Sequence, residues 1–91
     1  MSHRVVLAPG VARILERVRG STLVGLRGTI LALAHEPHPT RSRKLTGLDL
    51  YRVRLRIDGV PWRILYQVRD RERVVLITRV ARRDEGTYRR L

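Results

Sequence analysis

An alternating stretch over residues 51–68 constrains the fold of this chain more than any other feature. The sequence YRVRLRIDGVPWRILYQV contains two runs of alternating character, separated by Asp58-Gly59. Asp-Gly between such runs is typical of a β-hairpin, because a type I′ turn needs two residues that tolerate positive φ. We therefore predict two antiparallel strands that pair about this turn, with Arg54 directly opposite Arg63.

The two faces of this predicted hairpin differ in composition. One face is apolar or aromatic and consists of Tyr51, Val53, Leu55, Ile57, Trp62, Ile64, Tyr66 and Val68. The other face consists of Arg52, Arg54, Arg56, Arg63, Leu65 and Gln67. Like charges directly opposite each other destabilise a sheet, so this face predicts an anion that binds between the arginines. The alternative is a polar face that only contacts solvent.

The whole chain is strongly basic. It carries 20 Lys and Arg residues against 8 Asp and Glu, a formal net charge of +12, and every base except Lys44 is an arginine. A polyanion is the expected partner of such a chain, and arginine is the better bidentate ligand for phosphate. A GC-rich genome is an alternative reason for the choice of arginine over lysine. Residues 1–91 form a single domain, because so short a chain cannot bury two separate cores.

Several classes of site have no support in the composition. The absence of cysteine excludes a disulfide framework and a thiolate metal site. The pair His35 and His38 is interrupted by proline, which breaks the helical spacing that would aim both rings at one metal. We expect no metal and no other cofactor. Apolar runs are too short to span a membrane and no secretion signal is apparent, so we expect a cytoplasmic protein.

The remaining pattern predicts a two-layer α+β domain. We expect a strand over residues 4–8, a helix that ends at Gly20, a second helix from Ser21 or Thr22 to about Ala34, a loop over residues 36–49, the hairpin, and a last strand over residues 73–80. Two amphipathic helices can cover one face of a four-stranded sheet, which leaves the arginine face open. Gly25 and Gly28 mark either a close helix–helix contact or a weak helix.

The segment after the last predicted strand adds further candidates. Arg82, Arg83 and Tyr88 follow the strand closely, where a rigid scaffold usually presents functional groups. For Tyr88 we consider base stacking or proton transfer beside a packing role. Tyr51 and Tyr66 are predicted neighbours on the apolar face and are assigned to the core.

Two segments, KLTGLDLYRVRLRIDGVPWRILYQV and VVLITRVARRDEGTY, resemble the RelE/ParE superfamily of toxins from bacterial type II toxin–antitoxin systems, and the RelE branch in particular. The similarity extends from Lys44 to Tyr88, and the preceding strand and two helices fit the RelE-like fold. It implies a ribosome-dependent endoribonuclease, an mRNA interferase that cuts messenger RNA and inhibits translation. It also implies a cognate acidic antitoxin, RelB-like, that holds the toxin inactive.

The resemblance assigns catalytic roles to Arg52, Arg54, Arg63, Arg83 and Tyr88. Arg52 and Arg54 stand where the family often has two lysines. We assign RNA binding to Lys44, Arg56, Arg79 and Arg82. A guanidinium, with a pKa above about 12, can neutralise developing charge but does not serve as a general base. Tyr88 is therefore the candidate base, or a platform for base stacking, in a metal-independent attack of the RNA 2′-hydroxyl on phosphorus.

The chain also departs from the family pattern. One residue fewer separates Arg83 from Tyr88, Pro61 lies close to the hairpin turn, and we expect no helix after Tyr88. Two other functions therefore remain open. The first is a ParE-like inhibitor of DNA gyrase, and the second is a non-catalytic basic module that binds nucleic acid.

Overall fold

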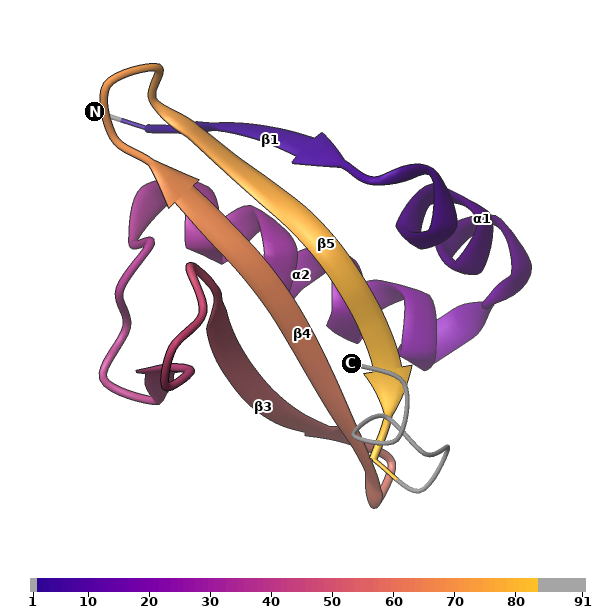
Figure 1. Ribbon diagram of the computed structural model, residues 1–91. Coiled ribbons are helices and arrows are strands. Elements are labelled where there is room, and N and C mark those ends of the chain that lie inside the picture. Colours follow the sequence, from indigo (N-terminus) through magenta and orange to yellow (C-terminus); the bar gives the residue numbers. More distant parts are fainter. Residues whose placement is uncertain (1, 84–91) are drawn as a thin grey trace.

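Two helices and five strands make up the computed structural model, which describes residues 2–83 (Figure 1). The elements are β1 (Arg4–Leu7), α1 (Pro9–Arg17), α2 (Gly20–His35), β2 (Ser42–Lys44), β3 (Tyr51–Ile57), β4 (Val60–Arg69) and β5 (Val74–Arg82). All strands belong to one sheet in the order β1-β5-β4-β3-β2. β1 pairs with β5 in parallel and every other pairing is antiparallel. The two-layer α+β class predicted from the sequence is confirmed.

The sheet has one strand more than the sequence analysis predicted. β2 lies inside the segment 36–49, for which we expected a loop, and it pairs with β3 at the edge of the sheet. Three residues are too few to show a period of two, so the segment carries no strand pattern of its own. Only the tertiary pairing with β3 therefore makes this segment a strand.

The hairpin forms as predicted. Asp58 and Gly59 have φ angles of 51° and 80°, in the left-handed region that a type I′ turn requires. Arg54 pairs directly with Arg63. The Ser21 hydroxyl donates a hydrogen bond to the Asp58 carboxylate, which joins the start of α2 to the hairpin turn.

Both helices lie on one face of the sheet, hereafter the inner face, and α2 crosses behind the strands in Figure 1. The core between helices and sheet contains Val11, Leu26, Ile30, Leu33, Val53, Ile57, Ile64, Tyr66, Val75, Ile77 and Val80. The assignment of Tyr51 and Tyr66 to this face is confirmed, because their rings stack with centroids 5.8 Å apart. The buried Tyr66 also donates a hydrogen bond of 2.8 Å to the Pro37 carbonyl.

The two glycines of α2 have different surroundings. A Cβ atom at Gly25 would lie 2.7 Å from Cδ1 of Ile57, so this glycine permits close packing of α2 on β3. A Cβ atom at Gly28 would meet nothing within 4 Å. The close contact considered from the sequence is thus a helix–sheet contact, and it involves Gly25 alone. Within residues 2–83 neither helix is long and apolar enough to cross a membrane.

Candidate functional site

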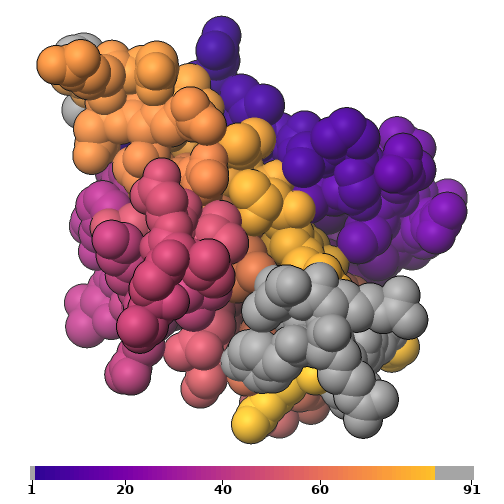
Figure 2. Space-filling model, in the orientation of Figure 1, coloured from indigo at the N-terminus to yellow at the C-terminus, as the bar shows by residue number. Residues whose placement is uncertain are grey.

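The face of the sheet opposite the helices, hereafter the outer face, carries successive rows of arginines. Cross-strand pairing places Arg54 beside Arg63, and the next row along the strands contains Arg52 and Leu65. Paired strands are about 4.8 Å apart and side chains on one face recur about every 7 Å along a strand. Guanidinium groups from β3 and β4 therefore lie over a small area. Figure 2 views this side of the molecule, where β5 lies in a trough between the β2–β3 segment and the N-terminal region.

Arg83 joins this group at the end of β5. Its backbone N–H donates a hydrogen bond of 3.0 Å to the Pro61 carbonyl, which holds the chain against β4 just past the last strand. A hollow of about 290 Å³ lies at this end of the sheet, and its lining includes Arg54, Arg56, Arg63 and Arg83. Four of the predicted arginines therefore surround one hollow.

Arg63 differs from its neighbours in burial. It is 2% exposed, whereas Arg54, Arg56 and Arg83 are exposed. Arginine is almost never so buried in proteins, because the charge must leave water. A buried cation at the floor of a ring of exposed cations is suited to an anion that approaches from solvent.

The electrostatics of the outer face follow from this crowding. Burial, followed by the positive charges of Arg54, Arg52 and Arg83, lowers the pKa of Arg63. Burial, followed by the charges of Arg54 and Arg43, lowers the pKa of Arg52. Each charged guanidinium is thus destabilised by its neighbours. A phosphate between the guanidinium groups would attract each of them and accept charge-assisted hydrogen bonds, which would offset their mutual repulsion.

β2 changes the predicted set of residues in two ways. Arg43 pairs with Arg52 and so belongs to the outer face, although the sequence analysis assigned it no role. Lys44, predicted to bind RNA, pairs with Tyr51 and lies on the inner face at the sheet edge. An alternation of three residues could not be phased without the partner strand, so no sequence signal identified Arg43.

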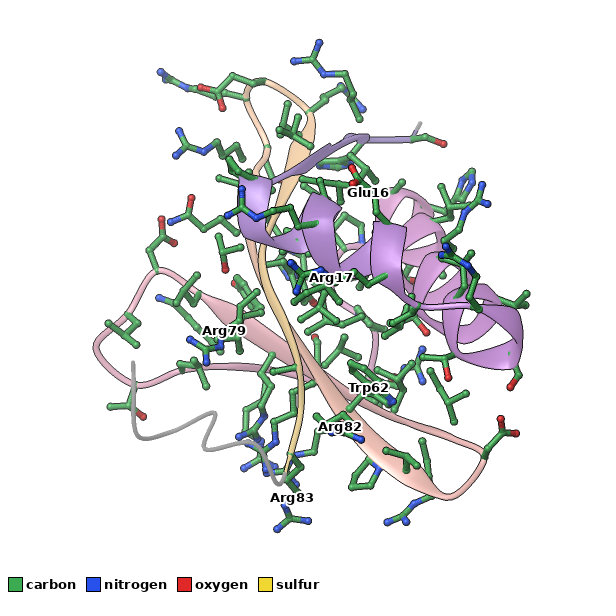
Figure 3. All side chains as sticks on the ribbon, turned by 90° about the vertical axis from the view of Figure 1, so that its right-hand side faces the viewer. Glu16, Arg17, Trp62, Arg79, Arg82 and Arg83 are labelled. Atoms are coloured by element: carbon green, nitrogen blue, oxygen red, sulfur yellow. The ribbon has the colours of Figure 1, made fainter. Side chains whose placement is uncertain are left out.

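β5 separates the two arginines that we assigned to RNA binding at its end. Arg79 pairs with Leu65 and lies on the outer face, whereas Arg82 pairs with Trp62 on the inner face. Figure 3 shows Arg79 and Arg82 on opposite sides of the β5 ribbon. The outer face therefore takes Arg79 but not Arg82.

The other predicted residues divide as follows. Arg56 pairs with Pro61 and lies on the outer face. Tyr88 is outside the described residues, so its catalytic role stays a prediction. Within residues 2–83, no three His, Cys, Asp or Glu side chains come together as metal ligands would. The described arginines can bind a phosphodiester and stabilise negative charge on its oxygens, but a proton acceptor must come from another group.

Comparisons with known proteins agree with the fold. Residues 5–86 match the family model for the ParE toxin of the type II toxin–antitoxin system parDE. A search of curated proteins gave no significant match. A mutant of the E. coli toxin RelE in the free state has 21% sequence identity and a TM-score of 0.75, with 94% of this chain and 88% of that chain covered.

Two complexes contain chains of the same fold. The toxin–antitoxin complex RelBE2 from Mycobacterium tuberculosis gives a TM-score of 0.76 at 22% identity, over 91% of this chain and 100% of that chain. The archaeal RelE–RelB complex from Pyrococcus horikoshii gives 0.73 at 24% identity, over 94% and 100%. At these identities the likeness concerns the fold.

Proposed function

The chain belongs to the RelE/ParE superfamily of toxins from type II toxin–antitoxin systems, and on this basis we propose that it is a RelE-type endoribonuclease that cleaves messenger RNA on the ribosome. The observation that carries this proposal is the convergence of Arg52, Arg54, Arg63 and Arg83 on the outer face. An inhibitor that only docks on a protein target needs no such crowding of like charges.

The proposed reaction is cleavage by the RNA itself. The 2′-oxygen attacks the adjacent phosphorus, a P–O bond forms, and the 5′-oxygen of the next nucleotide leaves with the electrons of the broken bond. The products are a 2′,3′-cyclic phosphate and a free 5′-hydroxyl group. One proton leaves the 2′-hydroxyl and another reaches the leaving oxygen, so a base and an acid are needed.

In this reaction the arginines stabilise negative charge. Negative charge gathers on the phosphoryl oxygens in the transition state, where Arg52, Arg54 and the buried Arg63 stabilise it. Arg83, exposed at the rim of the hollow, orients the phosphate or neutralises the leaving oxygen. Tyr88 is the proposed proton acceptor. Its phenol can lose a proton, which the guanidinium groups cannot do at neutral pH.

We further propose an acidic antitoxin of the RelB type as partner. The RelE chains from Mycobacterium tuberculosis and Pyrococcus horikoshii were solved in toxin–antitoxin complexes. A domain with a net charge of +12 attracts nucleic acid without selectivity unless a partner covers its basic surface. An acidic antitoxin would bring negative charge to the arginines of the outer face.

A cell-free translation system tests the nuclease directly. New 5′ ends are mapped on a defined message, with and without ribosomes, for the unmodified protein and for Arg83→Ala and Tyr88→Phe. Loss of one group that stabilises the transition state costs roughly 100-fold to 1000-fold in rate. Arg71→Ala is the matched control, because it removes one positive charge from the exposed β4–β5 turn. We expect cuts that need ribosomes, fall steeply in both variants and persist in the control.

The second candidate is a ParE-like inhibitor of DNA gyrase. It is favoured by one observation, that the matching family model describes the ParE toxin. An intact message in the assay above, together with inhibition in a gyrase supercoiling assay, would establish this function and overturn the nuclease. If the message stays intact and gyrase is not inhibited, but the protein binds RNA, the remaining function is that of a non-catalytic module that binds nucleic acid.

A further inference from the structure

An irregularity in β5 determines which of its residues face outward. The registers Tyr66–Ile77 and Leu65–Arg79 leave Thr78 as an extra residue without a partner in β4. With strict alternation, Arg79 would share the inner face with Val75 and Ile77, both of which are fully buried. A bulge changes the phase of a strand by one residue and can re-aim a side chain. Here it turns Arg79 to the outer face and Val80 to the core.

Thr78 makes a side-chain hydrogen bond across this bulge. Its hydroxyl donates a hydrogen bond of 3.1 Å to the Leu65 carbonyl, the backbone group of the residue that pairs with Arg79. A bulge disturbs the ladder of backbone hydrogen bonds, and the Thr78 hydroxyl adds a donor to a carbonyl beside it. Threonine also favours strands, since its branched side chain fits a pleated surface.

We propose that Thr78 is a positioning residue of the RNA site: the bulge that its hydroxyl fixes turns Arg79 onto the outer face as a further phosphate ligand. This inference rests on the proposed function, because it takes RNA as the ligand of the outer face. Thr78 acts through Arg79 and does not itself touch the RNA.

The row to which Arg79 belongs indicates what it contacts. Across the sheet this row runs from Arg43 through Arg52 and the buried Leu65 to Arg79. It is displaced by two residues along the strands, about 7 Å, from the row of Arg54 and Arg63. Arg79 is therefore placed to bind a neighbouring phosphate of the same strand, beyond the one held over Arg63.

Binding of a non-cleavable RNA tests the inference without requiring catalysis. A fluorescein-labelled 2′-O-methyl oligouridylate lacks the attacking hydroxyl, and its affinity is measured by anisotropy over a range of salt. One phosphate contact contributes about 0.7 to the salt slope on single strands, which is roughly fivefold in affinity at 0.1 M salt. We expect Arg79→Ala to show this loss and a correspondingly smaller slope.

The variants at position 78 then separate positioning from packing. Thr78→Val keeps the shape and removes the hydroxyl, and we expect it to reproduce most of the loss seen in Arg79→Ala. Thr78→Ser should bind like the unmodified protein. The double variant of Thr78→Val and Arg79→Ala should bind no more weakly than Arg79→Ala, because residues that act as a unit are not additive. A loss of roughly 25-fold, the product of two independent fivefold effects, would overturn the proposal.

Folding is monitored in parallel, since the same bulge places Val80 in the core. Thr29→Val, at a buried threonine of α2, is the matched control for the loss of a hydroxyl away from the outer face. If Thr78→Val does not fold, Thr78→Ala removes the same donor with less bulk beside the hollow of about 370 Å³ that Thr78 lines. Its binding is judged by the same criteria.

The outcomes for the two proposals are distinguishable. Absence of ribosome-dependent cuts, together with coupled losses at positions 78 and 79, would overturn the nuclease and leave the positioning role intact. Cleavage by the unmodified protein, together with wild-type affinity in Thr78→Val, would support the nuclease and overturn the role of Thr78.

Discussion

The two faces of the sheet are built from the same strands but have opposite energetic characters. On β4, Ile64 on the inner face and Arg63 on the outer face are adjacent in sequence and are 0% and 2% exposed. Burial of Ile64 among apolar side chains is favourable, by about 1.5–3 kcal/mol for a residue of this kind. Burial of Arg63 and the positive charges of Arg54, Arg52 and Arg83 disfavour its charged form and lower its pKa.

This difference shows that burial alone does not identify a residue's role. Burial of apolar side chains on the inner face stabilises the fold. The cations that lie close together on the outer face reduce this stability. Under the proposed function, such a face favours a polyanion, because its cations already lie close together. Substitutions that affect one face only test whether the two faces differ in this way.

The largest effect on stability is expected on the inner face. Ile64→Ala should lower the free energy of unfolding by about 2–5 kcal/mol, because it removes a fully buried side chain and leaves a cavity. Urea denaturation followed by circular dichroism measures the change. Arg63→Gln, one residue away, should lose cleavage or RNA binding while its stability changes far less. An equal loss of stability in both variants would show that the two faces do not differ as described.

A smaller effect is expected where α2 meets the inner face. Gly25→Ala introduces a Cβ atom 2.7 Å from Ile57, and overpacking of this kind costs about 1–3 kcal/mol. Gly28→Ala meets open space and should raise stability by up to about 1 kcal/mol through helix propensity. Thermal unfolding of the two variants should therefore move in opposite directions. RNA binding should change in neither, since neither residue lies on the outer face.

The smallest effect on stability, and one of opposite sign, is expected on the outer face. Arg54→Gln removes one charge of the directly opposed pair with Arg63, and relief of such repulsion is worth about 0.2–1 kcal/mol. The variant should therefore be slightly more stable than the unmodified protein and bind RNA more weakly. Salt at about 1 M screens exposed charges and should reduce the gain in stability. A destabilised variant would mean that Arg54 contributes to packing.

The pH dependence of that gain follows from the pKa values of Arg52 and Arg63. A basic group whose pKa is lowered on folding destabilises the native state while it is charged, and the penalty disappears only as pH rises above the folded pKa. Both groups are charged throughout the neutral range, so the penalty is constant there. The gain in Arg54→Gln should be the same at pH 6 and pH 8. At neutral pH a bound anion reduces this destabilisation, whereas a change of pH within that range leaves it unchanged.

Much of the site was predictable because the hairpin is local. The register of Arg54 against Arg63 follows from the turn at Asp58-Gly59, which both φ angles confirm. Burial of the inner residues of β3 and β4 follows from the period of two. The first strand and both helices were also predicted, although α1 begins at Pro9 and ends at Arg17, short of the expected Gly20.

The differences between the predicted and the observed placement of residues share one physical cause, which is that pairing with a neighbouring strand decides the face of each residue. No role was assigned to Arg43, and the inner-face position of Lys44 was not predicted, because β2 becomes a strand only on contact with β3. Arg82 was grouped with Arg79 although alternation over three residues places the two on opposite faces, and the bulge at Thr78, of which the sequence carries no sign, decides which face each one takes. In each case one residue of register decides the face, and that register is set by a partner strand.

The sequence by itself therefore determined the fold class, the central hairpin and the outward direction of Arg52, Arg54, Arg56 and Arg63, since turn chemistry and alternation act over a few residues. The tertiary structure alone decided that Arg43 and Arg79 join them and that Lys44 and Arg82 do not. It also decided the burial of Arg63, to which no local pattern points. Local preferences establish the period of a strand, and only the pairing of strands establishes its phase.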